Sequence, residues 1–238
     1  MKHGEKRFLS LMYVLSLSLL TAFAIHGLFS AQTVSAEGVP RHTIILDAGH
    51  GGADGGASGA DGTRESDLNL AVTLKTDAVL CLMGEETLLT RSDDGDLSDI
   101  TAETIAQKKV TDIRNRVALV NDHSGSILLS IHMNSFPQSK FYGPQVFFGA
   151  VGESKTLGEA IQNNLLLLVP ENQRKTKPIS SEVYLMNHIT VPAVLVECGF
   201  LTNGEELERL KTEDYQKQLA VILAVSAANH LGSEVPGV

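Results

Sequence analysis

Two histidines follow apolar segments rich in β-branched side chains. His50 follows residues 44–48 in a glycine-rich turn, and His132 follows residues 127–131. Each apolar segment predicts a buried strand, and ligands of α/β proteins bind at the carboxyl ends of such strands. Either histidine alone is typical of a solvated or hydrogen-bonded structural residue. Two histidines placed in this way indicate a metal site.

Two glutamates could complete that site. Glu65 lies at the start of a predicted helix, where an acid also interacts favourably with the helix dipole. Glu197 lies inside an apolar segment, where an ionised carboxylate is costly unless it is paired. An Arg or Lys partner for Glu197 is one interpretation, and a general base of perturbed pKa is the other. Two histidines, one glutamate ligand and a second glutamate are typical of catalytic zinc hydrolases, which use three protein ligands.

Predicted strands and helices alternate along the chain, and they must position these residues. Strands are predicted over 43–47, 87–90, 127–131, 145–148, 183–186 and 193–196, and helices over 67–83, 110–122, 153–169 and 214–231. Ser66 or Asp67 is expected to cap the first helix, and Gly84 to end it. The alternation predicts an α/β three-layer sandwich, in which a twisted, mixed or mainly parallel sheet of about six strands carries helices on both faces.

The composition excludes several classes of protein. The chain has 238 residues, of which 43% are hydrophobic, and a formal net charge of −9. These values indicate one globular domain and argue against a nucleic-acid partner, which would require a basic surface. Two cysteines cannot form a disulfide framework, so Cys81 and Cys198 are predicted to be buried free thiols. The aspartate-rich residues 92–109 predict a solvated loop, with the rim of a groove as the alternative.

The first 36 residues predict an export signal. Basic residues precede the apolar residues 8–25, and the small residues 34–36 suit cleavage after Ala36. The alternative is an uncleaved N-terminal anchor in contact with the membrane, because the apolar run is long enough to cross a bilayer. In either case residues 37–238 form the catalytic domain and lie outside the cytoplasmic membrane.

Several further residues are candidates for supporting roles. Asp47 and Asp54 could accept a hydrogen bond from the second ring nitrogen of His50, or could serve turn geometry instead. His188 is a candidate for substrate contact. The basic cluster Arg174, Lys175 and Lys177 either lies in solvent or binds a carboxylate.

Four motifs occur in order within residues 43–231: Asp47-Ala48-Gly49-His50-Gly51-Gly52, Glu65, Ser130-Ile131-His132-Met133-Asn134 and Val196-Glu197-Cys198-Gly199-Phe200. Together they resemble the zinc-dependent N-acetylmuramoyl-L-alanine amidases of the amidase-3 family. The resemblance implies Zn²⁺ as cofactor, His50, Glu65 and His132 as its ligands, and Glu197 as the catalytic acid/base. It also implies a peptidoglycan substrate, cleaved between the lactyl group of N-acetylmuramic acid and L-alanine.

Within that family, the segment Tyr184-Leu185-Met186-Asn187 and the residues after it are most similar to the sporulation-linked, germination-specific members. Those members remove stem peptides in the spore cortex before muramic δ-lactam forms. The similarity implies a location in the cell wall or the forespore intermembrane space, and it leaves the need for an activating partner protein open. Two other functions also remain open: a zinc peptidase that cuts within the stem, and a non-catalytic peptidoglycan-binding or regulatory protein on the same fold.

Overall fold

The computed structural model describes residues 42–233. The predicted export signal, residues 1–36, lies outside the described residues. Within the described part of the chain, no helix is both long enough and apolar enough to cross a membrane.

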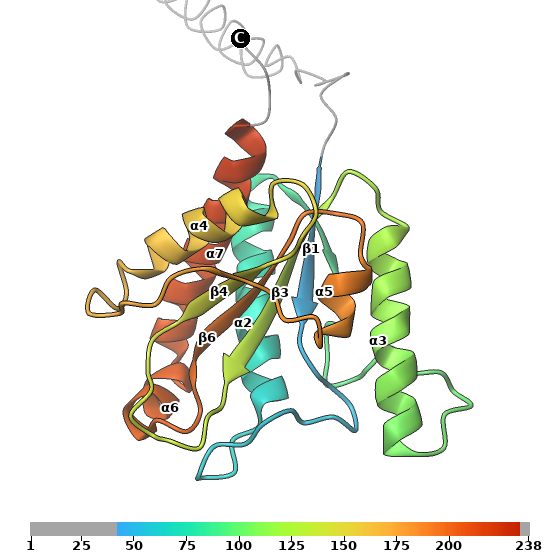
Figure 1. The fold of residues 1–238 in the computed structure, drawn as a ribbon, viewed down its shortest axis with the longest axis horizontal. Helices are drawn as coiled ribbons and strands as arrows, with labels where there is room; N and C mark the ends of the chain where they lie inside the picture. Colours follow the sequence, from blue (N-terminus) through green and yellow to red (C-terminus); the bar gives the residue numbers. More distant parts are fainter. Residues whose placement is uncertain (1–41, 234–238) are drawn as a thin grey trace, which may run out of the picture. The chain divides into compact units, whose positions relative to one another are not determined.

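A six-stranded mixed sheet forms the centre of the domain (Figure 1). Four neighbouring strands run parallel, and the other two run antiparallel to them at one edge. The apolar runs of the three inner parallel strands are buried on both faces, which is typical of a parallel sheet. The spatial order is β2 (Glu86–Leu89), β1 (Thr43–Ala48), β3 (Ile127–Asn134), β6 (Ala193–Phe200), β4 (Gln145–Phe148) and β5 (Lys177–Pro178).

Helices cover both faces of this sheet, so the predicted three-layer sandwich is confirmed. One face carries α2 (Glu65–Met83), α4 (Ser154–Leu165) and α7 (Glu213–Ser233), and α6 (Gly204–Leu210) follows the end of β6. The other face carries α3 (Ile105–Asn121) and the short α5 (Tyr184–His188). Figure 1 shows α5 in front of the sheet, with α2 and α7 behind it.

The first helix begins differently from the prediction and ends as predicted. Its N-cap is Arg64, which makes no side-chain capping bond, and Ser66 and Asp67 lie within the first turn. The predicted cap is therefore wrong, and the start of the helix is instead favoured by the acids Glu65 and Asp67 near the positive end of its dipole. Gly84 ends the helix in the left-handed conformation, with φ 84°.

The strand predicted over 183–186 is wrong, because these residues enter α5. Both edges of β6 are already occupied by β3 and β4, so the segment packs on the sheet instead of pairing with it. Leu185 and Met186 bury their side chains against the sheet face that also contains Leu195. A helical turn places these neighbouring apolar residues over the same core, which an extended segment would not do.

Three further departures concern the loops and the cysteines. Helix α3 begins at Ile105, five residues earlier than predicted, because Thr104 and Gln107 form a capping box. Two short elements, β5 and α6, were not predicted at all. Both cysteines are free as expected, but Cys81 is exposed, and only Cys198 is buried.

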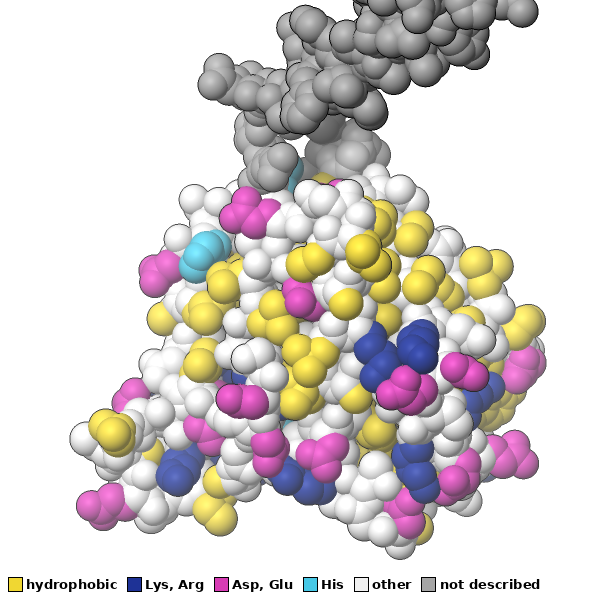
Figure 2. All heavy atoms as spheres, turned by 180° about the vertical axis from the view of Figure 1, so that it is seen from behind, with side chains coloured by type: hydrophobic (Ala, Val, Ile, Leu, Met, Phe, Trp, Pro, Cys, Tyr) yellow, Lys and Arg dark blue, Asp and Glu magenta, His cyan; other side chains and the backbone are white. Residues whose placement is uncertain are grey.

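The outer surface over α2 and α7 is partly apolar. Leu74, Val221 and Val225 are exposed there. Figure 2 shows this side of the molecule, where hydrophobic side chains gather between scattered charged ones. The polar residues of the predicted site lie elsewhere, at the carboxyl ends of the parallel strands.

Candidate active site

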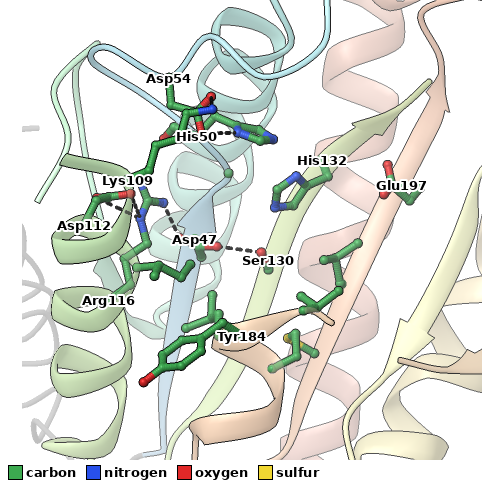
Figure 3. A pocket seen from close by; sticks show the side chains of 16 residues that line it. Asp47, His50, Asp54, Lys109, Asp112, Arg116, Ser130, His132, Tyr184 and Glu197 are labelled. Atoms are coloured by element: carbon green, nitrogen blue, oxygen red, sulfur yellow. Dashed lines mark hydrogen bonds and ion pairs between the residues drawn. The ribbon is translucent and has the colours of Figure 1, made fainter. Parts of the chain in front are cut away.

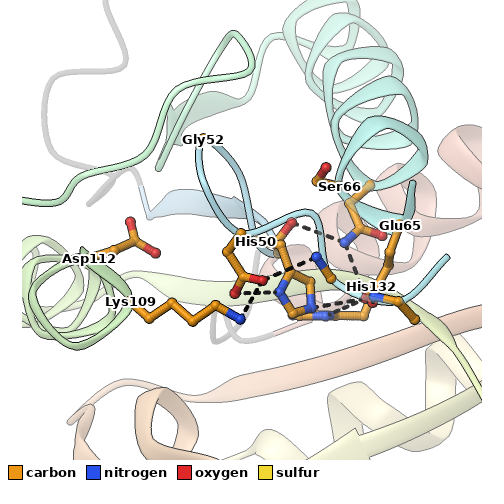
Figure 4. A network of polar contacts seen from close by, with 12 residues as sticks. His50, Gly52, Glu65, Ser66, Lys109, Asp112 and His132 are labelled. Atoms are coloured by element: carbon orange, nitrogen blue, oxygen red, sulfur yellow. Dashed lines mark hydrogen bonds and ion pairs between the residues drawn. The ribbon is translucent and has the colours of Figure 1, made fainter. Parts of the chain in front are cut away.

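Three side chains from three separate elements meet at the carboxyl edge of the sheet. His50 comes from the loop after β1, Glu65 is the first residue of α2, and His132 lies in β3. One ligand atom from each lies within 4.8 Å of the other two. The Glu65 Oε1 atom is 3.2 Å from His50 Nε2 and 3.0 Å from His132 Nδ1 (Figure 4). The structure thus brings the three predicted ligands together.

This donor set fits a zinc ion. Two imidazole nitrogens and one carboxylate are the protein ligands of a common class of catalytic zinc site. Burial opposes a charge on His50, but its hydrogen bonds to Glu65 and Asp54 and their negative charges raise its pKa to about 9. Burial likewise opposes the charge on Glu65, while His132 and His50 lower the pKa of Glu65 overall. The cluster therefore stabilises positive charge at its centre.

Asp54 contacts the His50 ring. Of the two interpretations of this residue, orientation of His50 and turn geometry, the contact supports the first. His50 Nδ1 lies 3.0 Å from Asp54 Oδ2, and the other carboxylate oxygen accepts a bond from Lys109 Nζ at 2.8 Å. Burial would raise the pKa of Asp54, but its bonds to Lys109 and His50 lower it to about 2. Imidazole ligands commonly use their second nitrogen in this way. Asp54 and Lys109 therefore restrict the ring orientation of His50.

Asp47 belongs to a different network and makes no bond to the His50 ring. It is fully buried and lies 2.6 Å from Arg116 Nη1. It also accepts hydrogen bonds from Thr90 at 2.8 Å and from Ser130 at 2.5 Å. Arg116 in turn binds Asp112 at 3.0 Å, so one buried cation is shared by two carboxylates.

Two buried arginines hold the backbone that presents His50. Arg116 donates to the carbonyl oxygens of Ala48 and His50, and Arg91 donates to those of Ala48 and Gly49. Among residues 42–233, His50 is the one non-glycine residue with a positive φ, 61°. Such a backbone persists where its surroundings determine it. Neither arginine is among the predicted site residues, although the Asp112–Arg116 spacing of four within a helix is a signal for the second.

Gly49 is required by the approach of His132. A β-carbon at Gly49 would lie 2.2 Å from His132 Cε1. Any side chain at this position would therefore displace one of the candidate metal ligands.

Glu197 lies beside the three-residue cluster and has no ionic partner. It is the register partner of His132 on the neighbouring strand β6. No Arg or Lys of the described chain pairs with it, and its Oε2 atom has no hydrogen-bond partner there. Burial, and then the negative charge of Glu65, raises the pKa of Glu197 to about 7, although His132 and His50 oppose the shift. The interpretation of Glu197 as half of an ion pair is therefore wrong.

A cavity of about 390 Å³ opens beside these residues, between α3 and α5 (Figure 3). His50, His132 and Glu197 lie at one end of it, and Tyr184 lies at the other. Leu195 and Met186 give it an apolar wall, and Lys109 and Arg116 line the α3 side. The cavity is large enough for part of a substrate next to the candidate metal ligands.

His188, the candidate for substrate contact, does not join the site. His188 belongs to α5, where its ring stacks on Tyr184 with centroids 3.8 Å apart and its Nδ1 contacts the Tyr184 carbonyl. It does not line the cavity.

The aspartate-rich loop before α3 is mostly exposed, as predicted. Lys109, which was predicted to belong to this loop, lies in α3 instead, and its side chain contacts Asp54.

Comparison with known proteins decides the family. Residues 44–228 match the Amidase_3 family of N-acetylmuramoyl-L-alanine amidases. The chain belongs to this family. Membership confirms the predicted enzyme, an N-acetylmuramoyl-L-alanine amidase, and the predicted fold class.

Individual members of the amidase family resemble the chain over most of its length. The germination-specific N-acetylmuramoyl-L-alanine amidase of Bacillus subtilis is 36% identical over 178 residues, which cover 74% of each chain. The CwlD amidase of Clostridioides difficile, solved in complex with the GerS lipoprotein, is 38% identical, with a TM-score of 0.77. That match covers 81% of this chain and all of the other. An N-acetylmuramoyl-L-alanine amidase of Clostridium difficile 630 is 26% identical with a TM-score of 0.71, and the match covers 82% of this chain and all of that one.

Proposed function

We propose that this amidase holds Zn²⁺ through His50, Glu65 and His132 and uses Glu197 as its catalytic acid/base. The observation that carries the proposal is the position of Glu197, one strand away from His132 and paired with no Arg or Lys of residues 42–233. When bound, zinc supplies Lewis acidity toward the scissile carbonyl and activates water. The convergence of two imidazoles and one carboxylate supports this choice of metal.

Glu197 is suited to move the proton that amide hydrolysis requires. Its raised pKa, about 7, lies close to neutral pH, so the carboxylate can both accept and return a proton. It would take a proton from the attacking water and deliver it to the nitrogen of L-alanine. That nitrogen then leaves as an amine, and the lactyl group stays on the glycan as a carboxylate.

We further propose that the enzyme acts outside the cytoplasmic membrane on spore cortex peptidoglycan. Residues 1–36 would be the export signal or a membrane anchor, and residues 37–238 the catalytic domain. The names of its relatives support this setting, since one is a germination-specific amidase. The complex of the CwlD amidase with a lipoprotein supports a partner protein for this chain as well.

The experiment is mass spectrometry of purified peptidoglycan digested by the full chain loaded with zinc. We expect stem peptides that begin with L-alanine, together with peptide-free glycan. Glu197→Gln should release neither, while the matched variant Glu182→Gln, at an exposed site, should behave as the unaltered chain does. Cuts within the stem would instead identify a peptidase. Activity retained by Glu197→Gln would refute the role given to this residue.

A further inference from the structure

Arg174 differs from its basic neighbours in the sequence. Lys175 and Lys177 are exposed, whereas Arg174 is partly buried and held in place. Its Nε atom donates to the Tyr142 carbonyl at 2.8 Å, and its Nη1 atom donates to Gln145 Oε1 at 3.1 Å. The predicted basic cluster therefore contains one ordered cation and two solvated ones.

Aromatic rings complete the fixation of this side chain. The Arg174 guanidinium carbon lies 4.5 Å from the ring centroid of Phe200 and 5.9 Å from that of Phe141. Guanidinium groups stack favourably on aromatic rings and keep their charge there. Because Phe200 ends β6, the charge is placed at the same carboxyl edge of the sheet as the active site.

The fixed guanidinium is linked to the strand that carries Glu197 through Gln145. Gln145, which accepts the bond from Arg174, is the register partner of Glu197 across strands β4 and β6. Directly opposed residues of antiparallel strands have Cβ atoms roughly 5 Å apart and project from the same face. In the sheet, His132 on β3 and Gln145 on β4 therefore flank Glu197 on opposite sides. Arg174 binds Gln145, so the Gln145 side chain stands between Arg174 and Glu197.

Arg174 forms no direct ion pair within residues 42–233, unlike the cations on the other side of the site, although the charge of Glu206 acts on it. Lys109 is paired with Asp54, and Arg116 is paired with Asp47 and Asp112. Within residues 42–233, no carboxylate forms an ion pair with Arg174, and its Nη2 atom forms no hydrogen bond. A fixed cation with a free donor is a typical binding site for a carboxylate.

We propose that Arg174 binds a carboxylate of the stem peptide and so selects substrates by the charge of the stem. This inference rests on the proposed function, in which the bond to L-alanine is cleaved beside Glu197. One extended residue spans about 3.4 Å, so a carboxylate on the second stem residue has the reach to meet a group one side chain away. The glycan portion then lies toward the cavity between α3 and α5.

The test uses two glycans of equal length whose stems differ at one group. In one glycan the second stem residue carries a free carboxylate, and in the other the same carboxyl is an amide. The readout is the ratio of kcat/KM for the free-carboxylate glycan to that for the amidated glycan. We expect about tenfold for the full chain, a typical effect of one charge-assisted bond, and about one for Arg174→Gln. Arg174→Lys should retain part of the preference, and Lys175→Gln all of it.

The ratio separates binding from folding, because a purely structural defect lowers both activities equally. A ratio near one for the unaltered chain would overturn the proposal, as would a preference that survives in Arg174→Gln. If the unaltered chain releases no stem peptide from either glycan, the proposed function itself fails, and this site fails with it.

Discussion

The two sides of the carboxyl edge of the sheet differ in how their charged side chains are paired. On the side of β1 and α3, Asp47, Asp54 and Asp112 each pair with a Lys or Arg, and the backbone carbonyls of residues 48–50 accept bonds from two buried arginines. On the side of β6 and β4, neither Glu197 nor Arg174 forms an ion pair with any residue that the structure describes. Pairing keeps ligand geometry rigid, whereas an unpaired charge is available to react or bind.

The largest effect is expected from the contrast between Glu65→Ala and Glu197→Ala. Glu65→Ala removes one of the three proposed metal ligands, so it should lose bound zinc as well as activity. Glu197→Ala should keep its zinc while turnover falls by about 10²–10⁴, the usual contribution of an acid/base group. Metal analysis of each purified variant beside its kcat checks this. Loss of zinc from Glu197→Ala would remove the distinction between the two sides.

Removing the shared cation should destabilise the β1 side strongly. Arg116→Met leaves the buried Asp47 without its cation, and such losses cost about 3–5 kcal/mol of unfolding free energy. Urea denaturation measures the change. Arg114→Met is the matched control, because Arg114 is exposed on the same helix and should change stability little. Equal stability of the two variants would contradict the role of the network.

The orientation of His50 should tune metal affinity without abolishing it. Asp54→Asn weakens the bond to His50 Nδ1 and the contact with Lys109, so we expect zinc to bind about 10–100-fold more weakly. Competition with a chelator of known affinity provides the measurement. Asp122→Asn, at an exposed position, should leave the affinity unchanged. An unchanged affinity in Asp54→Asn would show that the ring is fixed by other contacts.

The smallest effect concerns acid stability. Burial would raise the pKa of Asp47, but the charge of Arg116 and the bonds from Ser130 and Thr90 lower it to about 2. Since the folded-state value lies below the unfolded one, near 3.8, ionised Asp47 stabilises the fold above about pH 4. This contribution, about 2 kcal/mol, should be lost as the pH falls toward 2. The pH dependence of unfolding should therefore be less steep in Asp47→Asn over that interval, and identical slopes would contradict the assignment.

Much of the fold could be predicted because its strands carry continuous apolar runs with helical periods between them. Residues 183–186 could not, since a short apolar run suits a strand or a helix equally, and only the occupied edges of β6 decide between them. The two residues of β5 are too few to produce any pattern.

The site residues at strand ends could be predicted from the sequence. The residues that contact the site from distant parts of the sequence could not. His50, His132 and Glu197 follow or interrupt apolar runs, so their types stand out. Arg91 and Arg116 reach the His50 loop from 41 and 66 positions away in sequence, and a single chain carries no sign of such contacts. The export signal stays a prediction, as it lies outside the described residues.

The placement of β6 has a consequence for the order in which the enzyme is completed. All three candidate metal ligands lie between residues 50 and 132, on the loop after β1, the start of α2 and strand β3. Glu197 arrives only when β6 inserts between β3 and β4. In the order of synthesis, the three candidate metal ligands therefore precede the proposed proton-transfer group. A chain that contains only its first three strands would carry the candidate metal ligands and would lack the group proposed to complete hydrolysis.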